Sequence, residues 1–207
     1  MNSTTILNYA KRLKTMAHLG LTYASNAYEV ERYQELEQIS LEIMNGLTGQ
    51  PLETLSVYFE SKKEYITPKT DVRAVIFNER KEILLVKEKA DKKWSLPGGW
   101  ADIGLSPAEV AVKEVLEETG FNVQPKKLLA ILDKRCHPHP PQLDYVYKIF
   151  IHCEIVAGLP TAAFDILDTG FFVRNAIPEL SLDRVLPTQI DLMFEYLNNL
   201  KKEAIVD

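Results

Sequence analysis

The sequence predicts an α/β protein, a sandwich of helices around a mixed β-sheet, preceded by a small helical domain. Two observations predict this. Apolar residues recur at helical spacing through the first ~50 residues, whereas from about Tyr65 onward short runs rich in branched residues alternate with polar turns. Strands mixed with helices in this order are typical of layered α/β architectures. We therefore place the domains at residues 1–64 and 65–207.

Composition limits the classes of function. The 207 residues are 46% hydrophobic and 26% charged, which allows a sizeable core. The net charge of −5 argues against general nucleic-acid binding, and it means that a bound anionic substrate would need a local cation. Cys136 and Cys153 lack metal-type spacing, and no apolar run suits a signal peptide or a membrane span. We expect a cytoplasmic protein with reduced thiols.

The N-terminal domain is predicted to be a helical hairpin. Its second helix should end near Gly46, and the breaker sequence at 48–51 is a candidate linker. Both segments carry more apolar surface than one contact needs, so we expect a homodimer through these helices with Tyr28 and Tyr33 in or near the interface. The alternative is a monomer in which the helices cover their own active site. The first helix is indicated by Ile6, Ala10, Leu13 and Ala17.

The second domain mixes strands with two helices. The helix over 107–119 is well specified, because Ser106 and Glu109 form a capping box around Pro107, and Gly120 suits a left-handed cap. The last helix should open at Pro187. A β-hairpin is expected to join the first two strands. The strands are predicted at 72–77, 83–86, 94–96, 128–132, 145–156 and 171–173.

An acidic triplet occupies the end of the helix over 107–119. Glu114, Glu117 and Glu118 stand at i, i+3 and i+4, so they share one face in the last two turns. Mutual repulsion and the helix dipole disfavour this arrangement by about 1 kcal/mol. A bound divalent cation would reverse the sign of each of these effects, and carboxylates are the ligands that Mg²⁺ and Mn²⁺ prefer. The alternative is a solvated acidic helix face.

The residues from Gly99 to Phe121 resemble the signature of the Nudix hydrolase family. That signature is a glycine, five residues, a glutamate, seven residues, then Arg-Glu-apolar-x-Glu-Glu-x-Gly-apolar, and the spacing here is intact. The resemblance implies the Nudix α/β/α sandwich and a pyrophosphohydrolase that uses Mg²⁺, with Mn²⁺ as a substitute. It also implies that Glu114, Glu117 and Glu118, with the carbonyl of Gly98, coordinate the catalytic metals.

Two positions depart from the signature. Leu105 stands where the first glutamate is usual, and Lys113 stands where arginine is usual. If that glutamate and that arginine normally form an ion pair, losing both leaves neither charge without its partner. We therefore interpret the two changes as linked. This interpretation leaves the metal ligands in place and alters their surroundings.

The resemblance extends beyond the signature. Asp165 and Asp168 precede Phe171 and Phe172 in an acid-x-x-acid-x-x-aromatic-aromatic stretch seen late in many Nudix domains. The two aspartates are therefore candidates for the general base or for an extra metal ligand, and the alternative is a polar loop before a strand. Further candidates, for substrate binding, are Trp100, His137 and Arg73.

A helical extension before such a domain is similar to a bacterial Nudix subgroup that acts on nucleoside diphosphates linked to another group X. The resemblance implies hydrolysis of a compound such as CDP-choline or ADP-ribose to a nucleoside monophosphate and X-phosphate. Two alternatives stay open. One is a Nudix-like ligand-binding module without catalysis, and the other is a hydrolase of nucleoside triphosphates or RNA ends.

Overall fold

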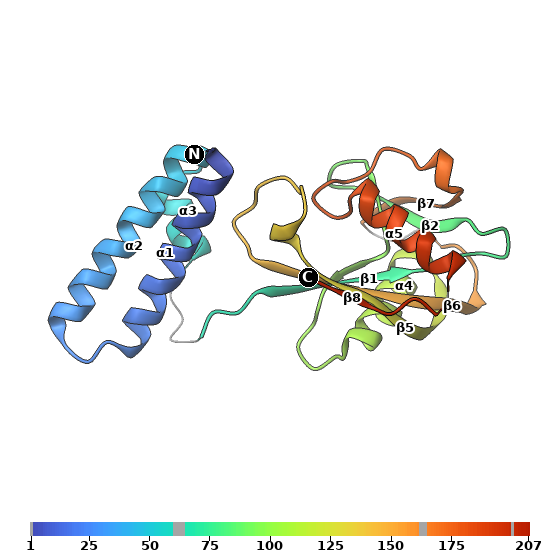
Figure 1. Cartoon of the computed structure of the whole chain (residues 1–207), viewed down its shortest axis with the longest axis horizontal. Coiled ribbons are helices and arrows are strands. Elements are labelled where there is room, and N and C mark those ends of the chain that lie inside the picture. The colour runs from blue at the N-terminus through green and yellow to red at the C-terminus, as the bar shows by residue number, and fades with distance from the viewer. Residues whose placement is uncertain (1, 60–64, 162–164, 200) are drawn as a thin grey trace. The chain divides into compact units, whose positions relative to one another are not determined.

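A computed structural model describes residues 2–59, 65–161, 165–199 and 201–207. The chain forms two compact units (Figure 1). The helical unit comprises residues 1–67 together with 141–143, and the sheet unit comprises residues 68–140 and 144–207. The short segment 141–143 thus belongs to the helical unit although it lies far along the chain.

The helical unit contains the predicted hairpin and one further helix. Helices α1 (Ser3–Tyr23) and α2 (Ala27–Thr48) begin at asparagine caps, Asn2 and Asn26. Gly49 ends α2 in a left-handed conformation, as a breaker should, but α3 (Leu52–Tyr58) follows directly. The expected linker at 48–51 is therefore only a turn between helices. The buried apolar residues of this unit are Leu7, Ala10, Leu41, Met44 and Leu55.

The sheet unit is built on two sheets. The larger has the order β4-β1-β6-β5-β8, with β1 parallel to β6 and antiparallel to β4, so it is mixed as predicted. The smaller has the order β3-β2-β7 and is antiparallel. The strands are β1 (Lys69–Val75), β2 (Ile83–Glu88), β3 (Trp94–Ser95), β4 (Gly98–Trp100), β5 (Phe121–Asp133), β6 (Val146–Gly158), β7 (Ile166–Phe172) and β8 (Ile205–Val206).

The predicted hairpin between the first two strands is confirmed only around its turn. Phe77 and Ile83 form an antiparallel bridge there, and the N–H groups of Asn78 and Leu84 donate to the carbonyls of Glu82 and Ile76 at 3.0 and 2.9 Å. β1 and β2 themselves belong to different sheets, so the pairing does not continue along them. The reason is that both strands carry buried residues on both faces. Such strands must be covered on two sides, which a two-stranded ribbon does not provide.

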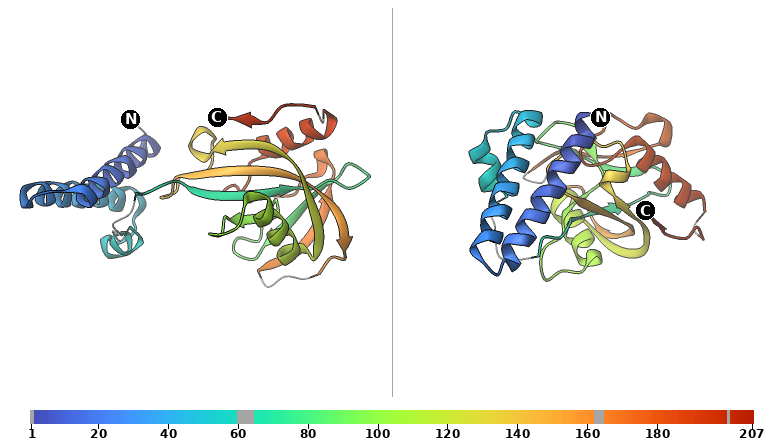
Figure 2. Two further views of the ribbon diagram at one scale, coloured as in Figure 1. Left: turned by 90° about the horizontal axis from the view of Figure 1, so that it is seen from below. Right: turned by 60° about the vertical axis from the view of Figure 1, so that its left-hand side comes forward.

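Helices α4 (Pro107–Thr119) and α5 (Pro187–Asn198) cover opposite faces of the larger sheet (Figure 2). Alternation along β1 shows the division: Val72 and Ala74 pack in the cluster that contains α4, and Val75 packs in the cluster that contains α5. An apolar layer therefore lies on each face of the larger sheet. The layer on the α4 side packs α4 against β1 and β4. In the described part of the chain, no helix combines the length and apolar character that a membrane span requires.

Candidate active site

Helix α4 has the ends that the sequence predicts. Ser106 and Glu109 form the capping box, and Gly120 closes the helix with φ of 76°. Val110, Ala111 and Val115 are buried and hold α4 on the sheet. The last two turns, which carry the acidic triplet, therefore have a fixed position beside β4.

The three glutamates share a helix face but differ sharply in burial. Glu118 is 6% exposed, whereas the side chain of Glu117 is 58% exposed, and Glu114 lies between them. Glu118 accepts a hydrogen bond from the backbone N–H of Gly98 at 2.9 Å. The triplet thus runs from a buried carboxylate against β4 to one that reaches into solvent.

The two glycines of the β4 segment make this contact possible. Gly98 has φ of 138°, and a Cβ there would lie 2.0 Å from the carbonyl oxygen of Val72. A Cβ on Gly99 would lie 3.1 Å from Oε2 of Glu114. Only glycine lets the strand approach both β1 and the carboxylates this closely.

Burial raises the pKa of Glu118 to about 8, despite the lowering effect of Arg73 and of the Gly98 N–H. Burial also raises the pKa of Glu114, and Glu117 adds to the effect while Lys113 opposes it. Their surroundings therefore do not offset the negative charge of these two carboxylates. Among the described residues, no three His, Cys, Asp or Glu side chains are already gathered around one point. The donor set nevertheless suits a hard divalent cation, which would supply the missing positive charge.

Arg73 is buried and directed at protein groups. Its Nε donates to Asp71 at 2.8 Å, and its Nη1 donates to the carbonyl of Leu96 at 3.0 Å and to Oγ of Ser95 at 3.3 Å. Asp71 also pairs with the fully buried Lys148 on β6. The guanidinium predicted to bind substrate therefore ties β1 to the segment that leads into Gly98, so the geometry favours a positioning role for Arg73.

A second polar network was not predicted from the sequence. Glu88, at the end of β2, accepts from Ser95 Oγ at 2.9 Å and from Arg184 Nε at 3.0 Å. Arg184 also reaches Asp91, which accepts from Ser181 Oγ at 2.6 Å. The sequence signal for this network was weak, a glutamate that follows the apolar run Ile83–Val86 and Lys87. The hydroxyl of Ser95 contacts both Arg73 and Glu88, so the two networks meet at the segment before Gly98.

The remaining candidate residues lie apart from the triplet. Asp165 and Asp168 are exposed at the start of β7, where the carbonyl of Asp165 accepts from Lys89 N–H and Asp168 accepts from Thr169 N–H. Trp100 is exposed at the end of β4, and Lys69 Nζ lies 5.5 Å from its ring centroid. His137 Nε2 lies 2.9 Å from Oδ2 of Asp207. Among the described residues, these four side chains share no hydrogen bond or ion pair with the three glutamates.

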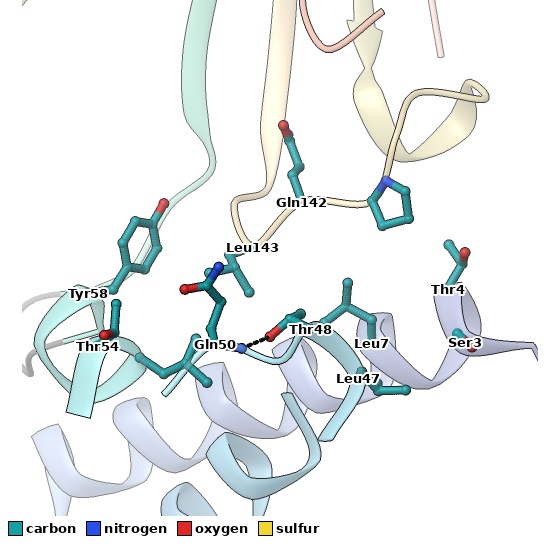
Figure 3. A pocket seen from close by; sticks show the side chains of 12 residues that line it. Ser3, Thr4, Leu7, Leu47, Thr48, Gln50, Thr54, Tyr58, Gln142 and Leu143 are labelled. Carbon is teal, nitrogen blue, oxygen red and sulfur yellow. Dashed lines mark hydrogen bonds between the residues drawn. The ribbon is translucent and has the colours of Figure 1, made fainter. Parts of the chain in front are cut away.

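The helical unit contains a separate pocket of about 410 Å³ (Figure 3). Its wall includes Leu7 of α1, Leu47 of α2, Tyr58 of α3 and Leu143 of the returning segment. Gln50 N–H donates to Thr48 Oγ1 at 3.2 Å at its edge. None of the twelve lining side chains is charged, so this pocket has no side-chain group to bind a metal ion or a phosphate.

Each of the two units matches a known protein family or domain. Residues 67–167 match the NUDIX domain, and residues 4–59 match Nudix_N, described as a UDP-X-like, N-terminal oligomerisation domain. A Bacillus subtilis (strain 168) protein named "Putative ADP-ribose pyrophosphatase YjhB" is 41% identical over 201 residues, which span 97% of this chain and 96% of the relative. The chain belongs to the Nudix hydrolase family and is an enzyme that acts on pyrophosphate bonds.

Solved structures support the same assignment. An ADP-ribose pyrophosphatase from Streptococcus suis 89-1591 is 39% identical with a TM-score of 0.62, over 68% of this chain and 100% of that one. A UDP-X diphosphatase is 29% identical with a TM-score of 0.64, over 100% of both chains. The predicted subgroup, with a helical domain before the Nudix domain, is thereby confirmed, and so is the predicted fold.

Proposed function

We propose that this enzyme hydrolyses the pyrophosphate bond of a nucleoside diphosphate linked to a group X, giving a nucleoside monophosphate and X-phosphate. The observation that carries the proposal is the contact of Glu118 and Glu114 with the Gly98–Gly99 strand, which places carboxylates of raised pKa beside a backbone held open by glycine. Relatives named for ADP-ribose and for UDP-X make ADP-ribose the first substrate to test, with CDP-choline beside it.

The metal ligands in this proposal are Glu114, Glu117, Glu118 and the carbonyl of Gly98, with Mg²⁺ as the natural ion and Mn²⁺ as a substitute. A bound divalent ion supplies a water of lowered pKa and neutralises phosphate charge. Within the protein, the Gly98 N–H orients Glu118 at 2.9 Å. Arg73 fixes the strand that carries Gly98 through Ser95 and Leu96. Trp100 and His137 are proposed to contact the substrate.

A substrate panel tests the function. ADP-ribose, UDP-glucose, CDP-choline, ADP-glucose, nucleoside triphosphates and a 5′-triphosphate RNA are incubated with Mg²⁺ or Mn²⁺ in ¹⁸O-labelled water, and products are read by mass. We expect a nucleoside monophosphate and X-phosphate from at least one linked diphosphate, with ¹⁸O in one product alone. Turnover confined to triphosphates or RNA ends would contradict the proposed substrate class. Binding without turnover would contradict the reaction.

Asp165 and Asp168 are proposed as candidates for the general base. A general base contributes about 10²–10⁴-fold to the rate, so Asp165→Asn or Asp168→Asn should lower kcat by about 100-fold or more while Mn²⁺ affinity changes little. Asp191→Asn, on the exposed surface of α5, is the control. Full activity of both amide variants would move the base elsewhere, for instance to the acidic triplet.

We further propose a homodimer through the helical unit, on a stripe of α1. Spacings of three, four and seven residues place its members on one helix face, which is the pattern that packs against a partner helix in a coiled coil. These side chains are exposed or half-buried, whereas Tyr33 covers Gly20 within its own chain, where a Cβ would lie 2.3 Å from the ring. Tyr28 is exposed on α2, so it stays a candidate for the interface. The stripe consists of Ile6, Tyr9, Leu13, Met16 and Tyr23.

Light scattering of the intact chain tests this surface. A dimer at micromolar concentration should dissociate in the double variant Tyr9→Glu, Met16→Glu, because two carboxylates would be buried without partners. Val57→Glu on α3 is the matched control, since Val57 is an exposed apolar residue outside the stripe. A monomeric native chain would reject the dimer, and a stripe variant that stays dimeric would place the interface elsewhere.

The compartment is proposed from the thiols. Cys136 is exposed and Cys153 is buried, and both are free. Unpaired cysteines suit a reducing compartment, so we propose the cytoplasm. Fractionation of cells with a specific antibody would test it, and recovery outside the cytoplasmic fraction would contradict it.

A further inference from the structure

The loop between β4 and α4 supplies a partner for Lys113. Oδ2 of Asp102 lies 2.6 Å from Lys113 Nζ, and Oε2 of Glu117 lies 3.6 Å from the same nitrogen. The ammonium therefore bridges the loop and the acidic triplet, and it sits closer to the loop. This arrangement corrects the interpretation that Leu105 and Lys113 leave no charge to be balanced, because Lys113 has recruited a different acid.

Asp102 and Leu105 occupy the same turn. The N–H of Leu105 donates to the carbonyl of Asp102 at 3.2 Å, and Gly104 between them has φ of 93°. Leu105 itself is exposed. The acid that the family signature places at the end of this turn is thus found here at its beginning, three residues earlier and still within reach of α4.

We propose that Asp102 is a positioning residue that keeps Lys113 beyond hydrogen-bond distance of Glu117 and so keeps the Glu117 carboxylate available to a metal ion. This inference rests on the proposed role of Glu117 as a metal ligand. Lys113 precedes Glu117 by four residues, on a long flexible side chain that can close on the carboxylate by rotation alone. The hydrogen bond to Asp102 holds the Lys113 ammonium in place. The ammonium is therefore close enough to Glu117 to attract its charge, but no oxygen of Glu117 is engaged in a direct hydrogen bond with it.

Removing the Asp102 charge should therefore weaken metal binding by allowing Lys113 to compete for Glu117. Mn²⁺ binding to the full chain without substrate is measured by calorimetry and by electron paramagnetic resonance. Residues that orient metal ligands contribute about 10–100-fold to affinity, so Asp102→Asn should weaken Mn²⁺ binding by about 10-fold. Saturating Mn²⁺ should restore most of kcat, which separates positioning from catalysis.

Two double variants distinguish competition by Lys113 from general damage to the loop. Asp102→Asn combined with Lys113→Met removes the competitor and should recover the affinity to within about 3-fold of the native protein, well inside the expected loss. Asp102→Asn combined with Leu105→Glu returns an acid to the same turn and should also recover it. If neither double variant recovers affinity, the proposal is overturned.

Matched controls separate this inference from the proposed function. Asp191 pairs with Arg174 at 2.7 Å, and its side chain is 52% exposed against 55% for Asp102, so Asp191→Asn removes an equivalent ion pair away from α4. That variant and Leu105→Ala should bind Mn²⁺ normally. Glu117→Gln must lose affinity, because otherwise the ligand assignment itself fails. If Glu117→Gln is impaired while Asp102→Asn binds as the native protein does, only the positioning role is rejected.

Discussion

Both units of this protein bury charged side chains, but they balance them differently. In the helical unit, Lys14 of α1 is 3% exposed and lies 2.7 Å from Glu37 of α2, while also donating to the carbonyl of Phe59. Those partners belong to the same unit, Glu37 on α2 and Phe59 directly after α3. The charge is thereby balanced inside the unit, and the pairing fixes how α1 and α2 align.

In the sheet unit, a fully paired buried carboxylate and an incompletely compensated one lie near each other. Asp71 has both Arg73 and Lys148 beside it. Glu118, only one strand away, has a pKa raised to about 8 because burial outweighs its favourable contacts. A perturbed carboxylate beside glycines that hold the backbone close is typical of a functional site, whereas a fully paired buried charge is typical of structural specificity. The paired charges of Lys14 and Asp71 thus differ from Glu118, the carboxylate that is proposed to bind a metal ion.

The sharpest test of that comparison is Glu118→Gln. The amide keeps the size and can still accept from Gly98 N–H, but it cannot supply a charged metal ligand. Metal stabilisation of the reaction is worth several kcal/mol, so turnover should fall by about 10²–10³-fold. The metal-free variant should melt at about the same temperature as the native protein near neutral pH, because a carboxyl whose pKa is raised to about 8 carries little charge there and the amide keeps its size.

Magnesium supplies the second half of this test. Mg²⁺ should raise the melting temperature of the native protein, since a ligand that binds only the folded state stabilises it. Glu118→Gln should show a much smaller shift. Glu195→Gln, an exposed residue of α5 paired with Lys202, should behave as the native protein does. Near-normal turnover in Glu118→Gln would show that Glu118 is a structural acid like Asp71, and would contradict the proposed difference between the two carboxylates.

Asp71→Asn should have the next largest effect, on stability. It leaves Arg73 and Lys148 buried without their shared carboxylate, and breaking such a buried pair costs about 3–5 kcal/mol. Urea unfolding followed by hydrogen exchange of β1 and β6 peptides measures this loss in the sheet unit. Asp144→Asn, at the outer end of the same sheet, is the control and should change stability by less than about 1 kcal/mol. Equal effects of the two substitutions would contradict the buried network.

Asp71→Asn should also change how the stability of the protein depends on acidic pH. Burial raises the pKa of Asp71, but Arg73 and Lys148 lower it by more, so the net pKa lies below its usual 3.8. The folded pKa is therefore depressed. The stability that this carboxylate provides is present above pH 3.8 and is lost as pH falls through the folded pKa. Asp71→Asn should unfold with a shallower pH dependence in that acidic window, as followed by circular dichroism.

The sequence predicts the parts of this site that depend on local rules. Helix α4 has the predicted first and last residues, because its capping box and Gly120 are local signals. The i, i+3, i+4 spacing of the glutamates places them on one face for the same reason. Their unequal burial could not be predicted, since it depends on how closely β4 approaches α4, and β4 was not expected as a strand.

Long-range polar partners were missed for a related reason. Asp71 and Lys148 are 77 residues apart and meet only because β1 pairs with β6 in a parallel register. Glu88 and Arg184 likewise come together through tertiary packing. Neither pair has a sequence spacing that marks it. The division of β1 and β2 between two sheets escaped prediction too, because a polar turn between apolar runs is equally compatible with a hairpin.

Lys14→Met should have the smallest effect of the three substitutions, and it tests the other side of the comparison. Methionine keeps an unbranched apolar chain in the α1–α2 contact, so packing is largely preserved. Glu37 loses its ion pair with Lys14, but its side chain is 23% exposed and can turn to water. We expect a loss of about 1–2 kcal/mol, below that of Asp71→Asn, because an acid that reaches solvent avoids most of the desolvation cost. Hydrogen exchange of α1 and α2 peptides in the full chain measures it locally, and turnover should be unchanged. A loss as large as that of Asp71→Asn would show that the helical unit depends on its buried charge as strongly as the sheet unit does.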